Sequence, residues 1–216
     1  MDLDDEIAGC AAAHQRLLAT LDGLTDDAAR RPSELPDWSV GHVLTHVARN
    51  ADSFVRVVEA AADGRVVDRY VDGVSGRNAD IETGARRPAV ELVDDVRSTI
   101  WRLEQTWATA PTAAWAGTSR EISGREIPIT DAPFLRWREV EVHHADLGLG
   151  FTFDDWSDAY VDAELTEQLA KLPARLVAVG PDPTEELRAR LGDRRLLAWL
   201  LGRWSDPDLP ELTSWG

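Results

Sequence analysis

The chain has 216 residues, of which 44% are hydrophobic and 29% are charged, and its formal net charge is -16. This length is enough for one large domain, or for a main domain with a small addition, and the composition is that of a protein with a buried hydrophobic core. The negative charge disfavours binding to the phosphates of nucleic acids, and no apolar run approaches the ~20 residues of a membrane span, so we expect neither a nucleic-acid nor a membrane function.

The N-terminal segment predicts a helix rather than a targeting signal. Residues 1–6 (MDLDDE) lack the basic start and the apolar stretch of a signal peptide, so we expect a cytoplasmic protein. Apolar residues recur at intervals of three and four over residues 4–21, which predicts the first helix. Cys10 in this helix is the only cysteine, which excludes an internal disulfide, and we expect it to be a small buried residue.

A second helix is predicted over residues 39–62, with Ser39 as its N-cap. His46 belongs to the apolar stripe of this helix and therefore faces the core, whereas His42 lies one turn earlier. A histidine on an apolar face is more often a hydrogen-bonded core residue than a metal ligand. The pattern of this helix alone therefore leaves the role of His46 open.

The middle of the chain alternates a long connection with further helices. Residues 63–88 predict a connection with a short helix after Gly84, and connections of this length are often functional. A third long helix is predicted over residues 89–108. Residues 115–129 indicate a short hairpin or an irregular link. The buried face of the third helix is predicted to contain Val90, Val93, Val96, Ile100, Leu103 and Trp107.

A fourth helix is predicted to begin near residues 130–133 (TDAP), and it carries carboxylate and imidazole side chains that suit a divalent metal. Because a helix turns by about 100° per residue, Glu139, His143 and Asp146 lie on one face. Glu139 and His143 are the better ligand pair. Catalytic zinc usually takes three protein ligands, and an inward-facing His46 is the candidate for the third. Four such helices predict a bundle with a metal site in its core.

Three segments resemble a known family. Residues 44–50 (LTHVARN), 76–78 (GRN) and 138–148 (REVEVHHADLG) are similar in order and spacing to the mycothiol-dependent maleylpyruvate isomerases, which belong to the DinB-like metalloenzymes. The resemblance implies a mainly α fold, with a DinB-like four-helix metal-binding bundle over residues 1–150. It also implies the zinc ligands, which are His46, Glu139 and His143.

The resemblance further implies a reaction. A metal-held thiolate of mycothiol adds to the cis double bond of maleylpyruvate, the resulting single bond rotates, and elimination gives fumarylpyruvate, as in gentisate-type aromatic degradation. Arg77 matches an arginine in the corresponding loop of the family, and a guanidinium suits the substrate carboxylates. Asp146 is expected to orient the ligands from outside the coordination sphere, although capping or a bond to Arg138 explains it equally well. Zinc is expected, although these ligands also suit nickel.

Residues 151–216 are expected to form a small C-terminal domain. Helices are predicted over residues 155–172 and 184–202, with a short strand at residues 176–179. The resemblance implies a mixed α/β domain here. The chain is shorter than the family between residues 179 and 191, so strands of that domain are expected to be reduced or missing.

The chain contains nine tryptophans, which is a high count for its length. Most of them, such as Trp101, Trp107 and Trp199, fall on apolar helical stripes. Core packing is therefore their expected role.

Two other functions remain open from the sequence. With the same ligands, the chain could be a mycothiol S-transferase that acts on another electrophile, because the ligands do not define the pocket. It could also be a non-catalytic DinB-like module whose metal is structural or absent, and a closed site of that kind predicts His42 as a fourth ligand. The expected partners are a small-molecule substrate and a low-molecular-weight thiol, and the chain is expected to be a monomer or a small homo-oligomer.

Overall fold

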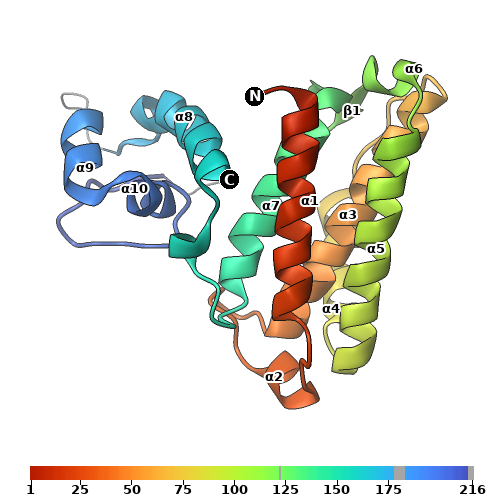
Figure 1. Ribbon diagram of the computed structural model, residues 1–216, viewed down its shortest axis with the longest axis horizontal. Coiled ribbons are helices and arrows are strands. Elements are labelled where there is room, and N and C mark those ends of the chain that lie inside the picture. The colour runs from red at the N-terminus through yellow and green to blue at the C-terminus, as the bar shows by residue number, and fades with distance from the viewer. Residues whose placement is uncertain (122, 178–182, 214–216) are drawn as a thin grey trace. The chain divides into compact units, whose positions relative to one another are not determined.

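The computed structural model describes residues 1–121, 123–177 and 183–213, which form two compact units with a boundary between residues 150 and 151 (Figure 1). Almost all regular structure in the described residues is helical, with one two-stranded sheet. None of these helices is both long enough and apolar enough to cross a membrane.

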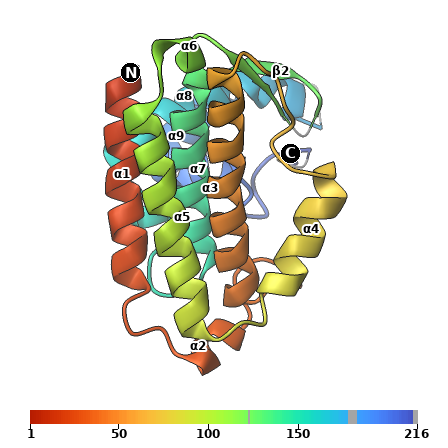
Figure 2. The same ribbon diagram turned by 90° about the vertical axis from the view of Figure 1, so that its right-hand side faces the viewer.

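The first unit is a bundle of four long helices. Helices α1 and α3 each pack against both α5 and α7, so the four form a ring around one core. Figures 1 and 2 show α1 and α7 running in one direction and α3 and α5 in the other. The neighbouring helices α3 and α7 are therefore antiparallel, which decides how their side chains pair. The bounds are α1 (Leu3–Thr20), α3 (Val40–Ala62), α5 (Ala89–Thr109) and α7 (Ala132–Asp146).

Helix α3 begins with a capping box and buries one continuous apolar face. The Ser39 side chain accepts a hydrogen bond from the backbone N–H of His42, and the His42 ring accepts one from the backbone N–H of Ser39. The predicted stripe is buried, including Val43 and Phe54, which are 0% and 1% exposed. His46 shares this stripe and is 2% exposed, so the cap and the stripe together fix its position in the bundle.

The connection between α3 and α5 differs from the prediction. It contains helix α4 (Gly73–Gly84), which ends at Gly84, so the short helix expected after that residue was wrong. The apolar pattern did not reveal α4 because Ile81 is its only buried residue and no side chain caps its N-terminus. Asp72, the residue before it, takes a left-handed conformation with a φ of 61°. Helix α4 packs on α3 and carries Arg77.

Helix α5 lies where it was predicted, but two residues were wrongly assigned to its buried face. Val90 is 65% exposed and Trp101 is 64% exposed. Each follows a buried residue, Ala89 or Ile100, and one position along a helix turns a side chain by about 100°. Trp107, which is 4% exposed, packs in the core as predicted.

Short elements complete the first unit. Helix α2 (Asp26–Arg30) lies between α1 and α3, and helix α6 (Thr112–Trp115) follows α5. The antiparallel strands β1 (Thr118–Arg120) and β2 (Glu126–Pro128) form a hairpin, one of the two alternatives expected here, with Ser119 opposite Ile127. A 3-10 turn, η1 (Ile129–Asp131), then leads into α7.

The second unit is helical in its described residues. The single helix predicted over residues 184–202 is divided in two, because Gly192 takes a positive φ of 71°. The described residues contain no strand here, only an isolated bridge between Leu176 and Leu212, and residues 178–179 of the predicted strand lie outside the described part. Trp199 is 6% exposed and belongs to the core, as predicted. The elements are η2 (Phe153–Asp155), α8 (Asp158–Arg175), α9 (Thr184–Leu191) and α10 (Asp193–Leu200), with α10 packed against the other two helices.

Candidate metal centre

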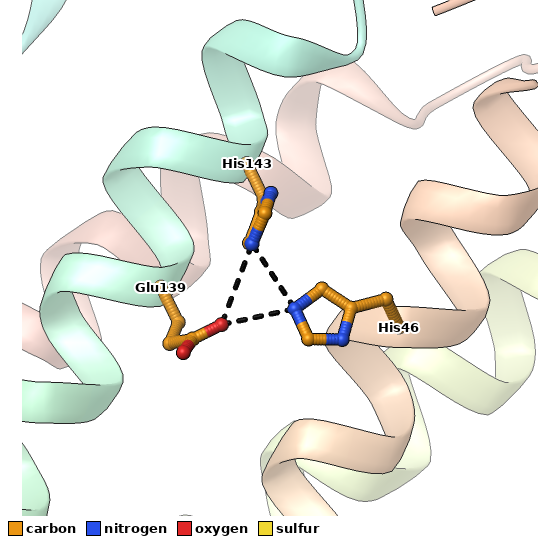
Figure 3. A group of neighbouring side chains, drawn as sticks. All are labelled: His46, Glu139 and His143. Carbon is orange, nitrogen blue, oxygen red and sulfur yellow. Dashed lines mark hydrogen bonds and ion pairs between the residues drawn. The ribbon is translucent and has the colours of Figure 1, made fainter. Parts of the chain in front are cut away.

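Three side chains from two helices converge at one point in the first unit (Figure 3). His46 extends from α3, whereas Glu139 and His143 extend from successive turns of α7. His46 Nε2 lies 3.0 Å from Glu139 Oε2 and 3.0 Å from His143 Nε2. The third distance, from His143 Nε2 to Glu139 Oε2, is 3.4 Å. The fold therefore brings together the three residues that the sequence suggested as ligands.

This donor cluster is largely buried, and Glu139 is its most exposed member. The side chains of His46, His143 and Glu139 are 3%, 12% and 27% exposed. Burial, helped by the nearby His143, lowers the pKa of His46 to about 4. Burial would raise the pKa of Glu139, but hydrogen bonds with His143 and His46 hold it well below its usual range. Glu139 is thus an anion and His46 a neutral ring at neutral pH.

Asp146 holds the ring of His143 from the side away from the cluster. Its Oδ2 lies 2.8 Å from His143 Nδ1, and Asp146 is only 2% exposed. Burial lowers the pKa of His143, but the bonds with Asp146 and Glu139 outweigh it and raise that pKa overall. Because a carboxylate accepts the Nδ1 proton, the Nε2 atom of His143 is the one directed at the cluster.

Arg77 reaches the cluster from α4. Its Nη2 lies 3.1 Å from His46 Nδ1, and its Cζ lies 6.0 Å from the ring centres of both Trp38 and Tyr70. A guanidinium can only donate hydrogen bonds, so His46 Nδ1 is the acceptor here and the ring proton lies on Nε2, facing Glu139. Metal binding at Nε2 requires the proton on Nδ1 instead. Arg77 must then turn to another acceptor.

The donor set suits a divalent metal. Two imidazole nitrogens and one carboxylate oxygen lie within 4.8 Å of one another, a combination that binds zinc and several other divalent ions. Three protein donors leave coordination positions for other ligands, as in catalytic sites. The residues therefore fit such an ion once His46 takes its other tautomer.

Comparison with known proteins assigns the family. Residues 10–148, well over half of the chain, match the family described as the mycothiol maleylpyruvate isomerase N-terminal domain. The chain belongs to this family. The matched residues include the donor cluster, Arg77 and Asp146. No curated protein matches the chain.

Two solved structures share the fold of this family member. They are the mycothiol-dependent maleylpyruvate isomerase and a histidine-to-alanine mutant of it. Each is 20% identical to the chain with a TM-score of 0.86, and the alignment covers 100% of this chain and 98% of the other. At this identity the likeness shows the mainly α fold, and it extends over both units.

His42 does not join the donor cluster of this maleylpyruvate isomerase family member. Its Nδ1 lies 2.7 Å from Ser39 Oγ, and its Nε2 lies 3.4 Å from Glu82 Oε1. Among the residues that the structure describes, no fourth protein donor is grouped with the three. A site closed by His42 is therefore not observed.

The sequence did not indicate three neighbours of the site in this family member. Trp38 packs its ring edge-on to His46, with ring centres 5.7 Å apart, and its place next to the N-cap of α3 was the only available signal. Tyr70 comes from the connection before α4 and had no signal. Arg136 lies three residues before Glu139 and is fully buried, whereas an arginine in a helix is usually at the surface.

Proposed function

We propose that this protein is a zinc- and mycothiol-dependent cis-trans isomerase that converts maleylpyruvate to fumarylpyruvate. The observation that carries the proposal is the convergence of His46, Glu139 and His143 in a member of this family, with the Glu139 side chain 27% exposed. Zinc fits a site with two imidazoles, one carboxylate and open positions. We also propose that residues 1–150 are the metal-binding domain and that residues 151–216 are the small C-terminal domain.

The donor cluster would hold the ion, and Asp146 would position the His143 ring from outside the coordination sphere. A divalent ion bound there lowers the pKa of a thiol ligand, so that the nucleophilic thiolate is present at neutral pH. Asp146 keeps the proton of His143 on Nδ1 and so leaves the Nε2 lone pair free for the ion. His46 supplies the second imidazole from the facing helix, and Glu139 supplies the negative charge.

Arg77 is proposed to bind a carboxylate of the substrate. Once the proton of His46 is on Nδ1, this atom no longer accepts a hydrogen bond from the Arg77 guanidinium. A substrate carboxylate then takes the place of His46 Nδ1 as the acceptor, in a charge-assisted hydrogen bond. The thiolate sulfur then forms a bond to one carbon of the cis double bond. At the same time, the π electron pair of this double bond moves toward the adjacent carbonyl group. Rotation and expulsion of the thiolate restore the double bond in the trans form. The thiol is regenerated, so no other reactant is needed.

The test combines metal content with turnover. Elemental analysis is made on protein purified without chelators or a His tag, together with an absorbance assay with mycothiol and maleylpyruvate. We expect one near-stoichiometric metal and thiol-dependent turnover, and we expect His46→Ala and His143→Ala to lose both. His42→Ala is the matched control, because it removes a nearby histidine outside the cluster. The Ser39 side chain still accepts the backbone N–H of residue 42 and caps α3, so this variant should keep the metal.

Each other result has a definite meaning. Metal without turnover would reject the isomerase and leave a mycothiol S-transferase with another electrophile. Failure to take up metal under every reloading condition would reject the metal site itself. Full metal occupancy in His46→Ala would remove that residue from the ligand set.

A further inference from the structure

Arg136 is a fully buried arginine beside the candidate metal centre. It lies on α7 and is 0% exposed. Its Nε donates to His14 Nε2 at 3.2 Å, and its Nη1 donates to the backbone oxygen of Val47 at 2.9 Å and to Asn50 Oδ1 at 2.7 Å. Its Nη2 has no hydrogen-bond partner among the described residues.

The positive charge of Arg136 has no direct counter-charge. Val47 contributes a carbonyl, Asn50 an amide, and His14 a ring whose pKa burial lowers to about 4, so all three acceptors are neutral at pH 7. The hydrogen-bond partners of Arg136 in the described part of the chain include no carboxylate. Burial lowers the pKa of the guanidinium, but an arginine keeps its charge at neutral pH even when buried. An unpaired buried charge is costly, and packing alone does not explain it.

The position of Arg136 relates it to the donor cluster. On α3, Asn50 follows His46 by one turn, and on the antiparallel α7, Arg136 precedes Glu139 by three residues. Arg136 and Asn50 therefore connect the same two helices as His46 and Glu139. Their contact lies about one turn further along the bundle, toward the C-terminal end of α3. One turn is about 5.4 Å along the axis, so a separation on the order of 5–10 Å between the guanidinium and the cluster is expected, and the charge of Glu139 acts on Arg136 electrostatically.

We propose that Arg136 is a positioning residue that acts on the metal centre through its charge. Its fixed positive charge favours the thiolate form of the metal-bound cosubstrate and lowers the affinity of the site for the metal ion. This inference rests on the proposed metal site. Two opposite effects follow from one charge. A nearby cation attracts an anionic ligand, which makes the thiol more acidic, and it repels a divalent cation, which lowers metal affinity.

The other groups around Arg136 do not cancel its charge. Cys10 and His14 face it from α1, and Tyr70 faces it from the connection before α4. Burial raises the pKa of the Cys10 thiol, so Cys10 is uncharged. Arg69 adds positive charge, and the carboxylates that interact electrostatically with Arg136 are Glu139 in the cluster and Asp52 on α3. Glu104 lies behind His14.

The test measures the acidity of a bound probe thiol in the Co2+-loaded protein. With 2-mercaptoethanol as the probe, the thiolate-to-cobalt charge-transfer band is followed against pH, and the Co2+ dissociation constant is measured by competition. A unit charge on the order of 8 Å away, at an effective dielectric constant of about 20, shifts a pKa by more than one unit. Arg136→Met should therefore raise the pKa of the bound thiol by about one unit and tighten Co2+ binding at least about tenfold.

Three further variants make the result specific to charge. Arg136→Lys keeps the charge and should leave the pKa of the thiol within about 0.3 units of the wild type. Asn50→Asp, nearly identical in shape, places a carboxylate on the guanidinium and should raise the pKa as Arg136→Met does. Arg102→Met removes the same formal charge from an exposed position, 57% exposed, and should change neither quantity.

The outcomes separate this inference from the proposed function. If the wild type shows no charge-transfer band, the metal site and the inference both fall. If the band is present but Asn50→Asp and any folded Arg136→Met leave the thiol pKa unchanged, the role of Arg136 is structural and the inference alone is rejected. A purely structural role would weaken Co2+ binding, whereas the proposed role tightens it. If Arg136→Met does not fold, the pKa of the bound thiol in Asn50→Asp decides between the two roles.

Discussion

Replacing Asp146 by asparagine tests how the ring of His143 is held. The change keeps the shape of the side chain but removes the charge of the oxygen that lies 2.8 Å from His143 Nδ1. A hydrogen bond to a charged group contributes about 1.5–3 kcal/mol, and this side chain is 2% exposed, so solvent does not replace the bond. At 1.4 kcal/mol per tenfold change, Asp146→Asn should weaken metal affinity by about 10–100-fold.

The same substitution has a predictable pH dependence. Asp146 helps to raise the pKa of His143 above the usual 6.5, so in the wild type protons begin to compete with the metal above pH 6.5. Without the carboxylate this pKa falls, and proton competition begins at a lower pH. The affinity difference between wild type and Asp146→Asn should therefore be largest at high pH and should shrink as the pH falls through the raised pKa of His143.

Competition titrations with a chromophoric chelator, from pH 5.5 to 8.5, measure both effects. Asp63→Asn is the control, because the Asp63 side chain is 68% exposed and Arg65, with which it forms an ion pair, is also exposed. An affinity of Asp146→Asn equal to the wild type at every pH would refute the orienting role. Asp146 would then serve only to cap the helix or to bind Arg138.

Other predictions address the substrate site, the core and the acid response. Arg77→Ala should raise KM for maleylpyruvate about 10–100-fold with unchanged metal content, and an unchanged KM would exclude carboxylate binding by Arg77. Trp107→Ala should lower the free energy of unfolding by about 3–5 kcal/mol, whereas Trp101→Ala should change it by less than about 0.5 kcal/mol, as urea titrations can measure. His14 is neutral and buried with a pKa of about 4, against 6.5 in the unfolded chain, so the unfolded state binds more protons and stability falls as the pH drops from 6.5 to 4. The loss of unfolding free energy attributable to His14 is about 3 kcal/mol. Urea titrations at pH 7 and pH 4.5 should show this loss in the wild type but not in His14→Gln. An equal loss in both proteins would show that His14 is not responsible.

The apolar pattern predicted the long helices because each buries a wide stripe in one core. Helix α3 has a side-chain cap and a continuous buried face, so its position could be predicted. Helix α4 has neither, because its polar surface faces solvent and Ile81 alone is buried, so the sequence there resembled a connection. On α5, the apolar character of Trp101 led to a wrong prediction of burial, because its side chain faces solvent.

The candidate site was partly predictable for a similar reason. Glu139 and His143 are four residues apart on one helix, and local geometry alone places them together. His46 and Glu139 are 93 positions apart in the sequence. The only sequence signal for their contact was the place of His46 on a buried apolar stripe. Arg77 and Arg136 depend on tertiary packing that no local pattern records. The family resemblance supplied Arg77, whereas nothing in the sequence distinguished Arg136 from a surface arginine.

The pairing of the first and last helices of the bundle constrains when this unit can form during synthesis. The ion pair between Arg16 on α1 and Glu141 on α7 joins residues 125 positions apart, and His144 reaches Thr20 over 124. A ribosome that adds roughly 5–20 residues per second needs on the order of 6–25 s to make the chain between them. During that interval the apolar face of α1 has not met α7, and His46 has no partner from that helix. The bundle closes only after residue 146 has left the exit tunnel, so a nascent chain that stops before α7 lacks two of the three donor residues and cannot assemble the site.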